Sequence, residues 1–243
     1  MEFTERMKCP VPDRPTSWPQ AAVPLEECGE PLVPASLFPS KILVRSWYFG
    51  EGLPGSLPEA WLREGVFDRL IRAARKLPEG WHFVVWDGWR SPVLQGTLFN
   101  ILLKRIRSEE PGLSEAEAED RAGVFVAFPS KDPMRLSGHF SGGAVDLTIA
   151  DDSGRYLDMG GGFDEPTERS FTDHYENAGH GHGHVARDNR RLLVSLMGEA
   201  GFDNYPQEWW HYDYGNRNWA IRTGAKAAIY GYAEPPFRWR EDL

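Results

Sequence analysis

The sequence has few cysteines and no apolar segment near its start. Its 243 residues include only Cys9 and Cys28, both among the first thirty positions. The first eight residues, Met1–Lys8, are mostly charged or polar and lack the apolar centre of a secretion signal. Two cysteines in such a chain favour free thiols over a disulfide. We therefore expect a protein of the reducing cytoplasm.

Long apolar runs and an excess of positive charge are also missing. No run of roughly eighteen apolar residues occurs, and a membrane-spanning helix needs one. With 27 Lys and Arg against 36 Asp and Glu, the formal net charge is −9. Nucleic-acid binding needs a basic face that neutralises phosphates. We therefore expect neither a membrane nor a nucleic acid as partner, and the sequence leaves the oligomeric state open.

The length suits one large domain or two small ones and is enough to bury a substantial core. Residues 1–40 are rich in proline and lack periodicity, which predicts an extended arm along the domain or a partly disordered segment. One folded domain is expected over residues 41–243. Within it, apolar patterns predict strands at 41–49, 81–86, 144–149, 208–214 and 225–232, and helices at 59–77, 92–108, 114–122 and 189–200. Helices segregated from a mostly antiparallel sheet define an α+β domain.

Two stretches carry the residue types of a catalytic metal site. In Ser137–Thr148, His139 and Asp146 are seven positions apart, and the residues between them are mostly small. Asp146 lies in an apolar strand, where a carboxylate is costly unless a cation or another partner pairs with it. About sixty residues later, His211 adds a second imidazole. Two imidazoles and one carboxylate suit zinc and leave a fourth position for water, so we expect one zinc ion per chain.

Glu208, three residues before His211, is the candidate general base, because it lies near a ligand without being needed as one. Taken singly, each ligand candidate has an ordinary interpretation, as a loop histidine, a buried acceptor or a core histidine. Their combined spacing favours the metal site. The zincin helix signature, two histidines flanking a glutamate, does not occur. The histidine-rich segment His180–His184 is expected to be an exposed, flexible loop.

Four motifs, in order along the chain, carry a resemblance to a known family. They are Asp87–Pro92, Ser137–Asp146, Met159–Ser170 and Glu208–His211. Together they resemble the D-alanyl-D-alanine dipeptidases of the VanX type. This group of zinc peptidases shares its fold with the Hedgehog signalling domain, so the resemblance implies a Hedgehog/DD-peptidase-like fold.

The resemblance implies a role for each matching residue of the metal site. His139, Asp146 and His211 would hold zinc, and Glu208 would act as general base and later as proton donor. Arg90 would stabilise the negative oxygen that develops when the peptide carbonyl is attacked. A surface salt bridge is the alternative interpretation of Arg90.

The resemblance also implies two contacts with substrate. Asp164 would accept the free amino terminus of the substrate, and Ser137 would contact the substrate near the metal. As alternatives, Asp164 is a turn acceptor and Ser137 a helix cap. The family has a tyrosine directly after its Val-Arg pair, whereas here Ser46 occupies that position and Tyr48 is displaced by two residues.

The leading hypothesis is therefore a zinc-dependent dipeptidase that cleaves D-Ala-D-Ala or a similar free dipeptide. Asp164 or Glu165 would provide its acidic anchor. One alternative is a zinc DD- or LD-carboxypeptidase acting on cell-wall peptides, which would need an open groove. The other is a non-catalytic, zinc-stabilised binding module. Glu208 and Arg90 argue against that module, because a structural site needs neither a base nor an oxyanion donor.

Overall fold

The computed structural model describes residues 2–15, 23–130 and 136–236. Parts of the predicted arm (1 and 16–22) and of the predicted domain (131–135 and 237–243) lie outside the described residues. The strands are β1 Leu32–Pro34, β2 Ile42–Val44, β3 Trp61–Arg63, β4 His82–Asp87, β5 Ala144–Ala150, β6 Asp203–Asn204 and β7 His211–Asp213. The α-helices are α1 Phe3–Arg6, α2 Trp47–Gly50, α3 Glu64–Ala74, α4 Pro92–Glu109, α5 Glu115–Gly123, α6 His182–Glu199 and α7 Arg217–Thr223.

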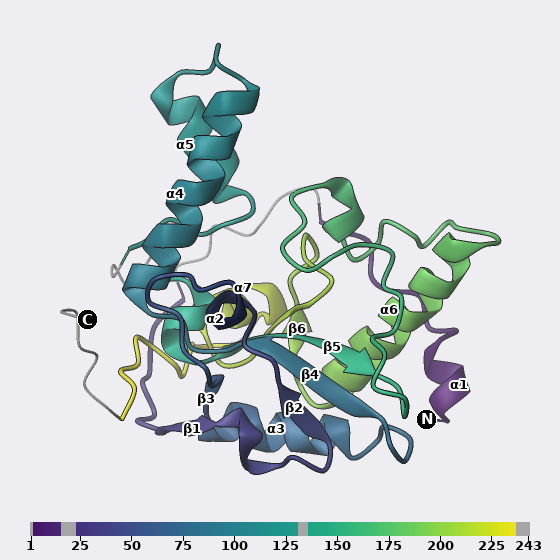
Figure 1. Ribbon diagram of the computed structural model, residues 1–243. Coiled ribbons are helices and arrows are strands. Elements are labelled where there is room, and N and C mark those ends of the chain that lie inside the picture. Colours follow the sequence, from purple (N-terminus) through teal and green to yellow (C-terminus); the bar gives the residue numbers. More distant parts are fainter. Residues whose placement is uncertain (1, 16–22, 131–135, 237–243) are drawn as a thin grey trace.

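The larger sheet has five strands in the order β2-β4-β5-β7-β6 (Figure 1). The β2–β4 pair is parallel, and the other three pairs are antiparallel. This confirms an α+β fold with a mostly antiparallel sheet. The register places Asp146 of β5 opposite Asp87 on one side and opposite His211 on the other. Three polar residues distant in sequence therefore lie in one row across the middle of the sheet.

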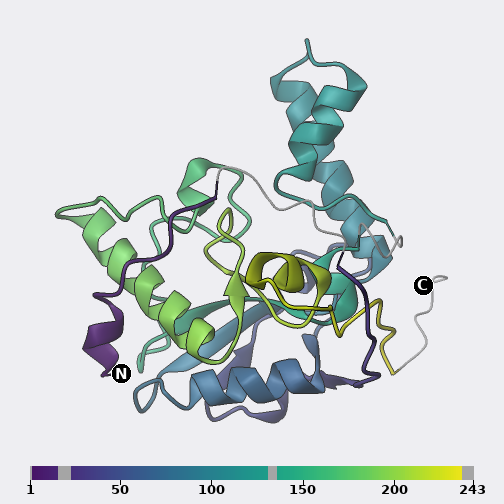
Figure 2. The ribbon, with the colours of Figure 1, turned by 180° about the vertical axis from the view of Figure 1, so that it is seen from behind.

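Helices α3, α6 and α7 lie on one face of this sheet, as the view from behind shows (Figure 2). The central strand β5 is buried along its whole length, because it is paired on both edges and covered on both faces. Its apolar side chains join those of β4, α3 and α6 in one core. Within the described residues, no helix is both long enough and apolar enough to cross a membrane.

Helices α4 and α5 form a hairpin that projects away from the sheet (Figure 1). Ser91 caps α4: its hydroxyl accepts a hydrogen bond from the backbone N–H of Leu94 at 3.0 Å, and Pro92 is the first helical residue. The hairpin has a small core of its own, made of Phe99, Leu103, Ile106, Ala118 and Ala122. Helix α4 begins directly after Arg90 and Ser91. The base of the hairpin is therefore only a few residues from the end of β4, which carries Asp87 of the polar row.

Among the predicted elements that differ in the structure, three are decided by contacts distant in sequence. The strand predicted at 41–49 ends at Val44, and α2 follows, with Trp47 packed edge-on against Trp86. The helix predicted at 59–77 begins only at Glu64, because residues 61–63 form β3 and pair with β1. The strand predicted at 225–232 is absent from the described residues, apart from a single bridge at Ala228.

The histidine-rich segment was predicted as a loop, and this is wrong for its second half. Helix α6 begins at His182, and His184 lies in its first turn. His182 stays fully exposed and His184 partly exposed, each 3.5 Å from one carboxylate, of Asp158 and Asp188 respectively. The division into an arm and a catalytic domain stays a prediction. Within the arm, α1 packs against α6 and β1 pairs with β3.

Candidate metal centre

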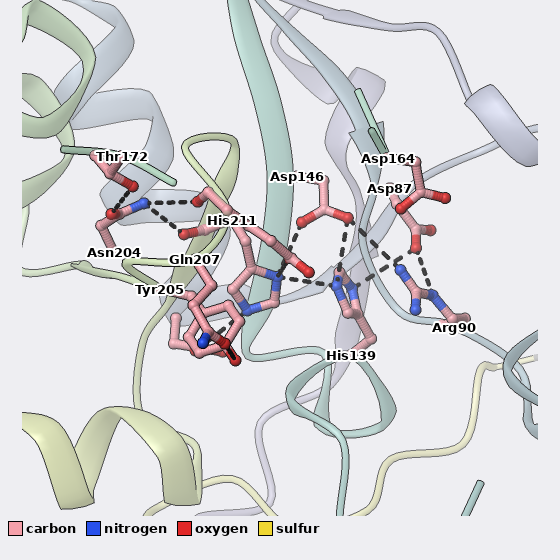
Figure 3. A network of polar contacts seen from close by, with 12 residues as sticks. Asp87, Arg90, His139, Asp146, Asp164, Thr172, Asn204, Tyr205, Gln207 and His211 are labelled. Atoms are coloured by element: carbon pink, nitrogen blue, oxygen red, sulfur yellow. Dashed lines mark hydrogen bonds and ion pairs between the residues drawn. The ribbon is translucent and has the colours of Figure 1, made fainter. Parts of the chain in front are cut away.

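The structure brings the three predicted metal ligands together in the row across the sheet (Figure 3). His139 Nε2 lies 3.2 Å from His211 Nδ1 and 3.4 Å from Asp146 Oδ2. His211 Nδ1 lies 3.0 Å from Asp146 Oδ1. All three side chains are buried. Ligands bound tetrahedrally to zinc at about 2.0–2.2 Å lie roughly 3.3 Å from one another, so this donor set fits the ion.

The two imidazoles are oriented by hydrogen bonds on their far sides. His139 Nδ1 lies 2.7 Å from the carbonyl oxygen of Gly88, and His211 Nε2 lies 3.2 Å from Asp213 Oδ2. Donation of an N–H to each acceptor leaves His139 Nε2 and His211 Nδ1 with free lone pairs that face Asp146. Such outer contacts set the tautomer and ring orientation of histidines that bind metals. In their neutral forms the two imidazoles therefore present ligand atoms to the centre of the cluster.

Asp213 is part of a buried network under the cluster. Its carboxylate accepts hydrogen bonds from Arg222 Nη2 at 2.7 Å and from Asn216 Nδ2 at 2.5 Å, in addition to its contact with His211. These positive and polar partners outweigh the effect of burial and hold the pKa of Asp213 well below its usual value. A methyl group on Gly138 would lie only 2.5 Å from Asp213 Oδ1. The glycine beside His139 therefore lets the two ligand-bearing segments approach each other.

The charges of the cluster favour an ionised Asp146. Burial alone would raise the pKa of this carboxyl, but the neighbouring His139 and His211 outweigh it, and the pKa of Asp146 lies well below its usual value. Burial alone would lower the pKa of His211, but Asp213 and Asp146 raise it well above its usual value. The site is thus built to stabilise positive charge at its centre, as a cation site requires.

Arg90 lies beside the ligand cluster and contacts three side chains there. Its Nε donates to Asp87 Oδ2 at 2.8 Å, and its Nη1 donates to Gln95 Oε1 at 3.0 Å. Its Nη2 lies 3.6 Å from Asp146 Oδ2. The guanidinium is buried, so the alternative of a surface salt bridge is wrong. Arg90 places a fixed positive charge beside the ligand cluster.

Glu208 lies in the turn between β6 and β7, three residues before His211. Its Oε2 is 3.7 Å from His211 Nδ1. The amide of Asn204 donates to the backbone oxygens of both Glu208 and His211, at 3.1 and 3.0 Å, and itself accepts from Thr172 (Figure 3). Burial raises the pKa of Glu208 to about 8, an effect that His211 opposes. Glu208 is therefore fixed next to the cluster without completing the donor set.

Asp164 lies on the Arg90 side of the cluster and accepts a hydrogen bond from the hydroxyl of Tyr48 at 3.0 Å. Its backbone has φ 58°, a left-handed conformation that Asp tolerates better than most residues do. The protein packed around it raises the pKa of Asp164, and Arg90 and Tyr48 oppose this rise. Such strained residues gather at functional sites. The neighbouring residue Phe163 anchors the turn.

Phe163 packs against four aromatic rings from three parts of the chain. Its ring centroid lies 4.8 Å from that of Trp86, 5.4 Å from Trp210, 5.5 Å from Trp47 and 5.7 Å from Tyr48. These contacts form a rigid apolar wall behind Asp164. They give Trp47 and Tyr48, both in α2, a packing role that the sequence pattern did not show.

Arg190 of α6 fixes the segment that carries Asp164. Its guanidinium is buried and donates to the backbone oxygens of Met159, Arg169 and Phe171 at 2.6–2.8 Å. Burial lowers the pKa of Arg190 to about 10. One buried cation therefore joins the backbone at Met159, before Asp164, to the backbone at Arg169 and Phe171, after it. This explains how a long loop can hold a side chain in place.

One cavity of about 370 Å³ is lined by all seven predicted site residues: Arg90, Ser137, His139, Asp146, Asp164, Glu208 and His211. Ser137 is buried and lines it, and so does Asp164. Glu165, the other candidate for an acidic anchor, does not line the cavity; its carboxylate binds Gly162 and Thr167 instead. Trp210 lines the cavity, whereas Trp209 is buried outside its lining.

Sequence reasoning missed five supporting residues: Tyr48, Asp87, Gln95, Asn204 and Asp213. Asp87 was quoted only as part of a motif. For Asp213, the signal was present as a second acid two positions after His211 on the same strand, where side chains share a face. The others act through contacts between distant segments.

Comparisons with known proteins show what the chain is similar to. The sequence profile of the Peptidase M15 family, described as D-ala-D-ala dipeptidase, matches residues 68–227. A D-alanyl-D-alanine dipeptidase of Synechocystis sp. is 30% identical over 240 residues, which cover 89% of this chain and 97% of that protein. The D-alanyl-D-alanine dipeptidase of Escherichia coli is 43% identical over 77 residues, which cover 32% of this chain and 37% of that protein.

Among solved structures, a vancomycin resistance D,D-pentapeptidase, VanY, in complex with Zn(II), is 21% identical in sequence. The match covers 70% of this chain and 81% of that chain, with a TM-score of 0.40.

Proposed function

The chain belongs to the peptidase M15 family of D-alanyl-D-alanine dipeptidases, and we propose that it hydrolyses D-Ala-D-Ala or a closely similar free dipeptide. The observation that carries the proposal is the content of a single cavity: a His-Asp-His cluster, an acid beside it, a buried arginine and an acidic anchor. A purely structural metal site needs only the first of these. The four together match the needs of peptide hydrolysis.

We propose that His139, Asp146 and His211 hold one zinc ion per chain. The support is the donor set, the separations of 3.0–3.4 Å and the outer hydrogen bonds that turn the lone pairs inward. Zinc in such a site supplies Lewis acidity, which polarises a carbonyl and makes water a nucleophile near neutral pH. The remaining steps belong to residues of the chain.

Asp164 and Tyr48 bind the amino end of the substrate. A carboxylate that faces the cavity pairs with the ammonium group of a free dipeptide, and Tyr48 holds that carboxylate in place at 3.0 Å. The aromatic wall around Phe163 closes the space behind them. A substrate whose amino end continues into a longer chain would lose the ion pair and meet this wall. The arrangement therefore favours free dipeptides over internal peptide bonds.

Glu208 moves the proton. One of its carboxylate oxygens accepts a proton from the attacking water. Glu208 then donates this proton to the nitrogen of the leaving residue. The pKa of about 8 refers to the site without a cation, and a cation at the cluster favours the carboxylate form that a base requires. The distance of 3.7 Å between its Oε2 and His211 Nδ1 supports this role.

Arg90 stabilises the negative charge that develops on the carbonyl oxygen. Its guanidinium is fixed by Asp87 and Gln95 before substrate binds, so little reorganisation is needed during reaction. Ser137, buried at the edge of the cavity, is proposed to contact the substrate near the metal. Cys9 and Cys28 are both free thiols, in keeping with the reducing cytoplasm we propose as the site of action.

The test is the release of free D-alanine from D-Ala-D-Ala by the zinc-loaded protein, beside L-Ala-L-Ala and N-acetyl-D-Ala-D-Ala. We expect turnover of the free D,D-dipeptide alone, because acetylation removes the ammonium group that Asp164 binds. Preferred turnover of the acetylated compound would instead establish the carboxypeptidase alternative. Bound zinc without turnover of any of the three would favour a non-catalytic module.

A further inference from the structure

His139 is held differently from the other two residues of the cluster. Strands β5 and β7 carry Asp146 and His211, whereas His139 lies in the short 3-10 helix Gly138–Ser141 before β5. Its ring nevertheless faces both partners (Figure 3). We call residues 138–142 the ligand turn. Strand pairing places two of the ligands directly, so the contacts of the ligand turn decide where the third one lies.

Arg63, the last residue of β3, is buried and binds two consecutive carbonyl oxygens of the ligand turn. Its side-chain Nε donates to the Ser141 oxygen at 2.8 Å, and its backbone N–H donates to the Gly142 oxygen at 2.9 Å. Gly142 has φ 68°, and a methyl group there would collide with the Leu32 side chain of β1. The end of the ligand turn is therefore fixed against the β1–β3 pair.

Strand β3 also holds the group that faces the imidazole of His139. His139 Nδ1 lies 2.7 Å from the carbonyl oxygen of Gly88. The next residue, Trp89, donates its backbone N–H to the oxygen of Trp61 in β3 at 2.6 Å. A methyl group on Gly88 would lie only 2.7 Å from that same oxygen. One short strand therefore contacts both the backbone of the ligand turn and the segment that orients its histidine.

The guanidinium of Arg63 is itself held by residues of the predicted arm. Its Nη1 donates to the backbone oxygen of Glu30 at 2.5 Å, and its Nη1 and Nη2 lie 3.1 and 3.2 Å from the carboxylate oxygens of Glu27. Its Nη2 also donates to the Gly231 oxygen at 3.3 Å. A buried cation is costly without such partners. The arm thus completes the surroundings of the residue that binds the ligand turn.

We propose that Arg63 is a positioning residue of the metal site, which fixes the ligand turn so that His139 faces Asp146 and His211 before zinc binds. The inference rests on the proposed zinc site and gives the arm a part in it. Arg63 does not line the cavity and acts only through the backbone of the ligand turn. Without it, zinc binding would also have to order the turn, which lowers affinity.

The experiment compares wild type with Arg63→Lys, which keeps the charge but loses the planar fork of donors. Competition with a chelator measures zinc affinity, and we expect it to fall about tenfold in the variant. The visible spectrum of the cobalt-substituted protein reports the ligand geometry, and its bands should change. KM for D-Ala-D-Ala should stay close to that of wild type, because Arg63 does not contact the amino-end anchor.

The matched control is Arg190→Lys. Arg190 is also buried and also donates to three backbone oxygens, but in the segment that carries Asp164. This variant should raise KM and leave zinc affinity and the cobalt spectrum unchanged. An equal loss of zinc affinity in both variants would overturn the inference, because general loosening of the fold would then explain it.

Glu27→Gln keeps the test valid if Arg63→Lys does not fold. It removes the carboxylate charge that faces Arg63, and zinc affinity should fall in the same direction by a smaller factor. Its control is Glu30→Gln, because the carboxylate of Glu30 binds Gly65 and Tyr230 instead of the guanidinium. This control should keep the zinc affinity of wild type.

Two further outcomes separate this inference from the proposed function. Wild-type zinc affinity and an unchanged cobalt spectrum in every folded variant of Arg63 and Glu27 would overturn the inference and leave the proposed function standing. A wild-type protein that binds no zinc would reject the proposed zinc site and this inference with it.

Discussion

The ligand cluster and the amino-end anchor lie in one cavity but are held by different kinds of structure. Asp146 and His211 sit opposite each other on paired strands, and His139 precedes the first of these strands in a short 3-10 helix. Asp164 sits in a long loop and Tyr48 in a short helix, 116 residues apart. Backbone pairing fixes the first group, whereas side-chain packing and Arg190 fix the second. We therefore expect the cluster to be rigid and the anchor to be the more adaptable part.

The largest expected effect comes from removing a cluster ligand. His211→Ala leaves His139 and Asp146 as the two remaining metal ligands. We expect this variant to lose its bound zinc. The rate of hydrolysis should then fall by several orders of magnitude. Metal analysis of the purified protein and D-alanine release measure the two effects. Full zinc occupancy in this variant would remove His211 from the ligand set.

Asp164→Asn tests the anchor without disturbing the cluster. Asparagine tolerates the left-handed backbone at this position but cannot form an ion pair with the ammonium group. Hydrogen bonds to charged groups contribute about 1.5–3 kcal/mol, so kcat/KM for D-Ala-D-Ala should fall roughly tenfold to a hundredfold. Zinc content should not change.

The matched control for the anchor is Glu165→Gln, because this neighbouring carboxylate binds Gly162 and Thr167 instead of facing the cavity. Steady-state kinetics of both variants separate the two acids. If kcat/KM fell equally in Glu165→Gln, the fall in Asp164→Asn would come from a change in the whole loop and not from the loss of the ion pair.

Asp213→Asn tests whether zinc binding by the cluster depends on the contact between His211 Nε2 and Asp213 Oδ2. The change removes the negative charge that faces His211 and Arg222. Loss of such an outer partner typically lowers metal affinity by about tenfold to a hundredfold, and competition with a chelator measures it. Asp203→Asn removes the other carboxylate bound to Arg222 and should change zinc affinity much less. Similar affinities in all three proteins would count against a positioning role for Asp213.

The smallest effect concerns a contact outside both groups. Glu199 of α6 binds Lys76 and Arg6 at 2.6 and 2.7 Å, and the hydrogen bond from Lys76, together with Arg6, lowers its pKa to about 2. A lowered pKa stabilises the fold above the unfolded-state value near 4.5, and this contribution is lost as the pH falls towards 2. Glu199→Gln should lower stability by at most about 1 kcal/mol at pH 7.

Thermal unfolding of wild type and Glu199→Gln at pH 7 and at pH 3 measures this contribution of Glu199 to stability. The difference in Tm should shrink at the lower pH. Hydrolysis and zinc affinity at pH 7 should be the same in both proteins. A difference in Tm that grows as the pH falls would contradict the assignment.

The difference between the two groups also explains what the sequence could predict. His139, Asp146, His211 and Glu208 lie in two compact motifs, and strand pairing alone brings these motifs together. Arg90 lies shortly after β4, which pairs with β5, and its role was implied by the resemblance of Asp87–Pro92. Ser91 as the cap of α4 was likewise a local signal.

Tyr48 could not be placed in the same way. The run 41–49 has the composition of a strand, but after Val44 the packing of Trp47 and Tyr48 on Phe163 favours a helix. That packing joins segments more than one hundred residues apart. For the same reason Asn204 and Gln95, which act through distant backbone oxygens, had no local signal.

The central claim is that Glu208 acts on the reaction and not on the metal. The most direct measurement is zinc content and D-alanine release from D-Ala-D-Ala in the same preparation of Glu208→Gln, beside wild type. Glutamine keeps the size of the side chain and removes its basic oxygen. We predict one zinc per chain in both proteins and a rate about 10²- to 10⁴-fold lower in the variant, as removal of a general base predicts. Loss of zinc from Glu208→Gln, or retention of the wild-type rate, would contradict this account.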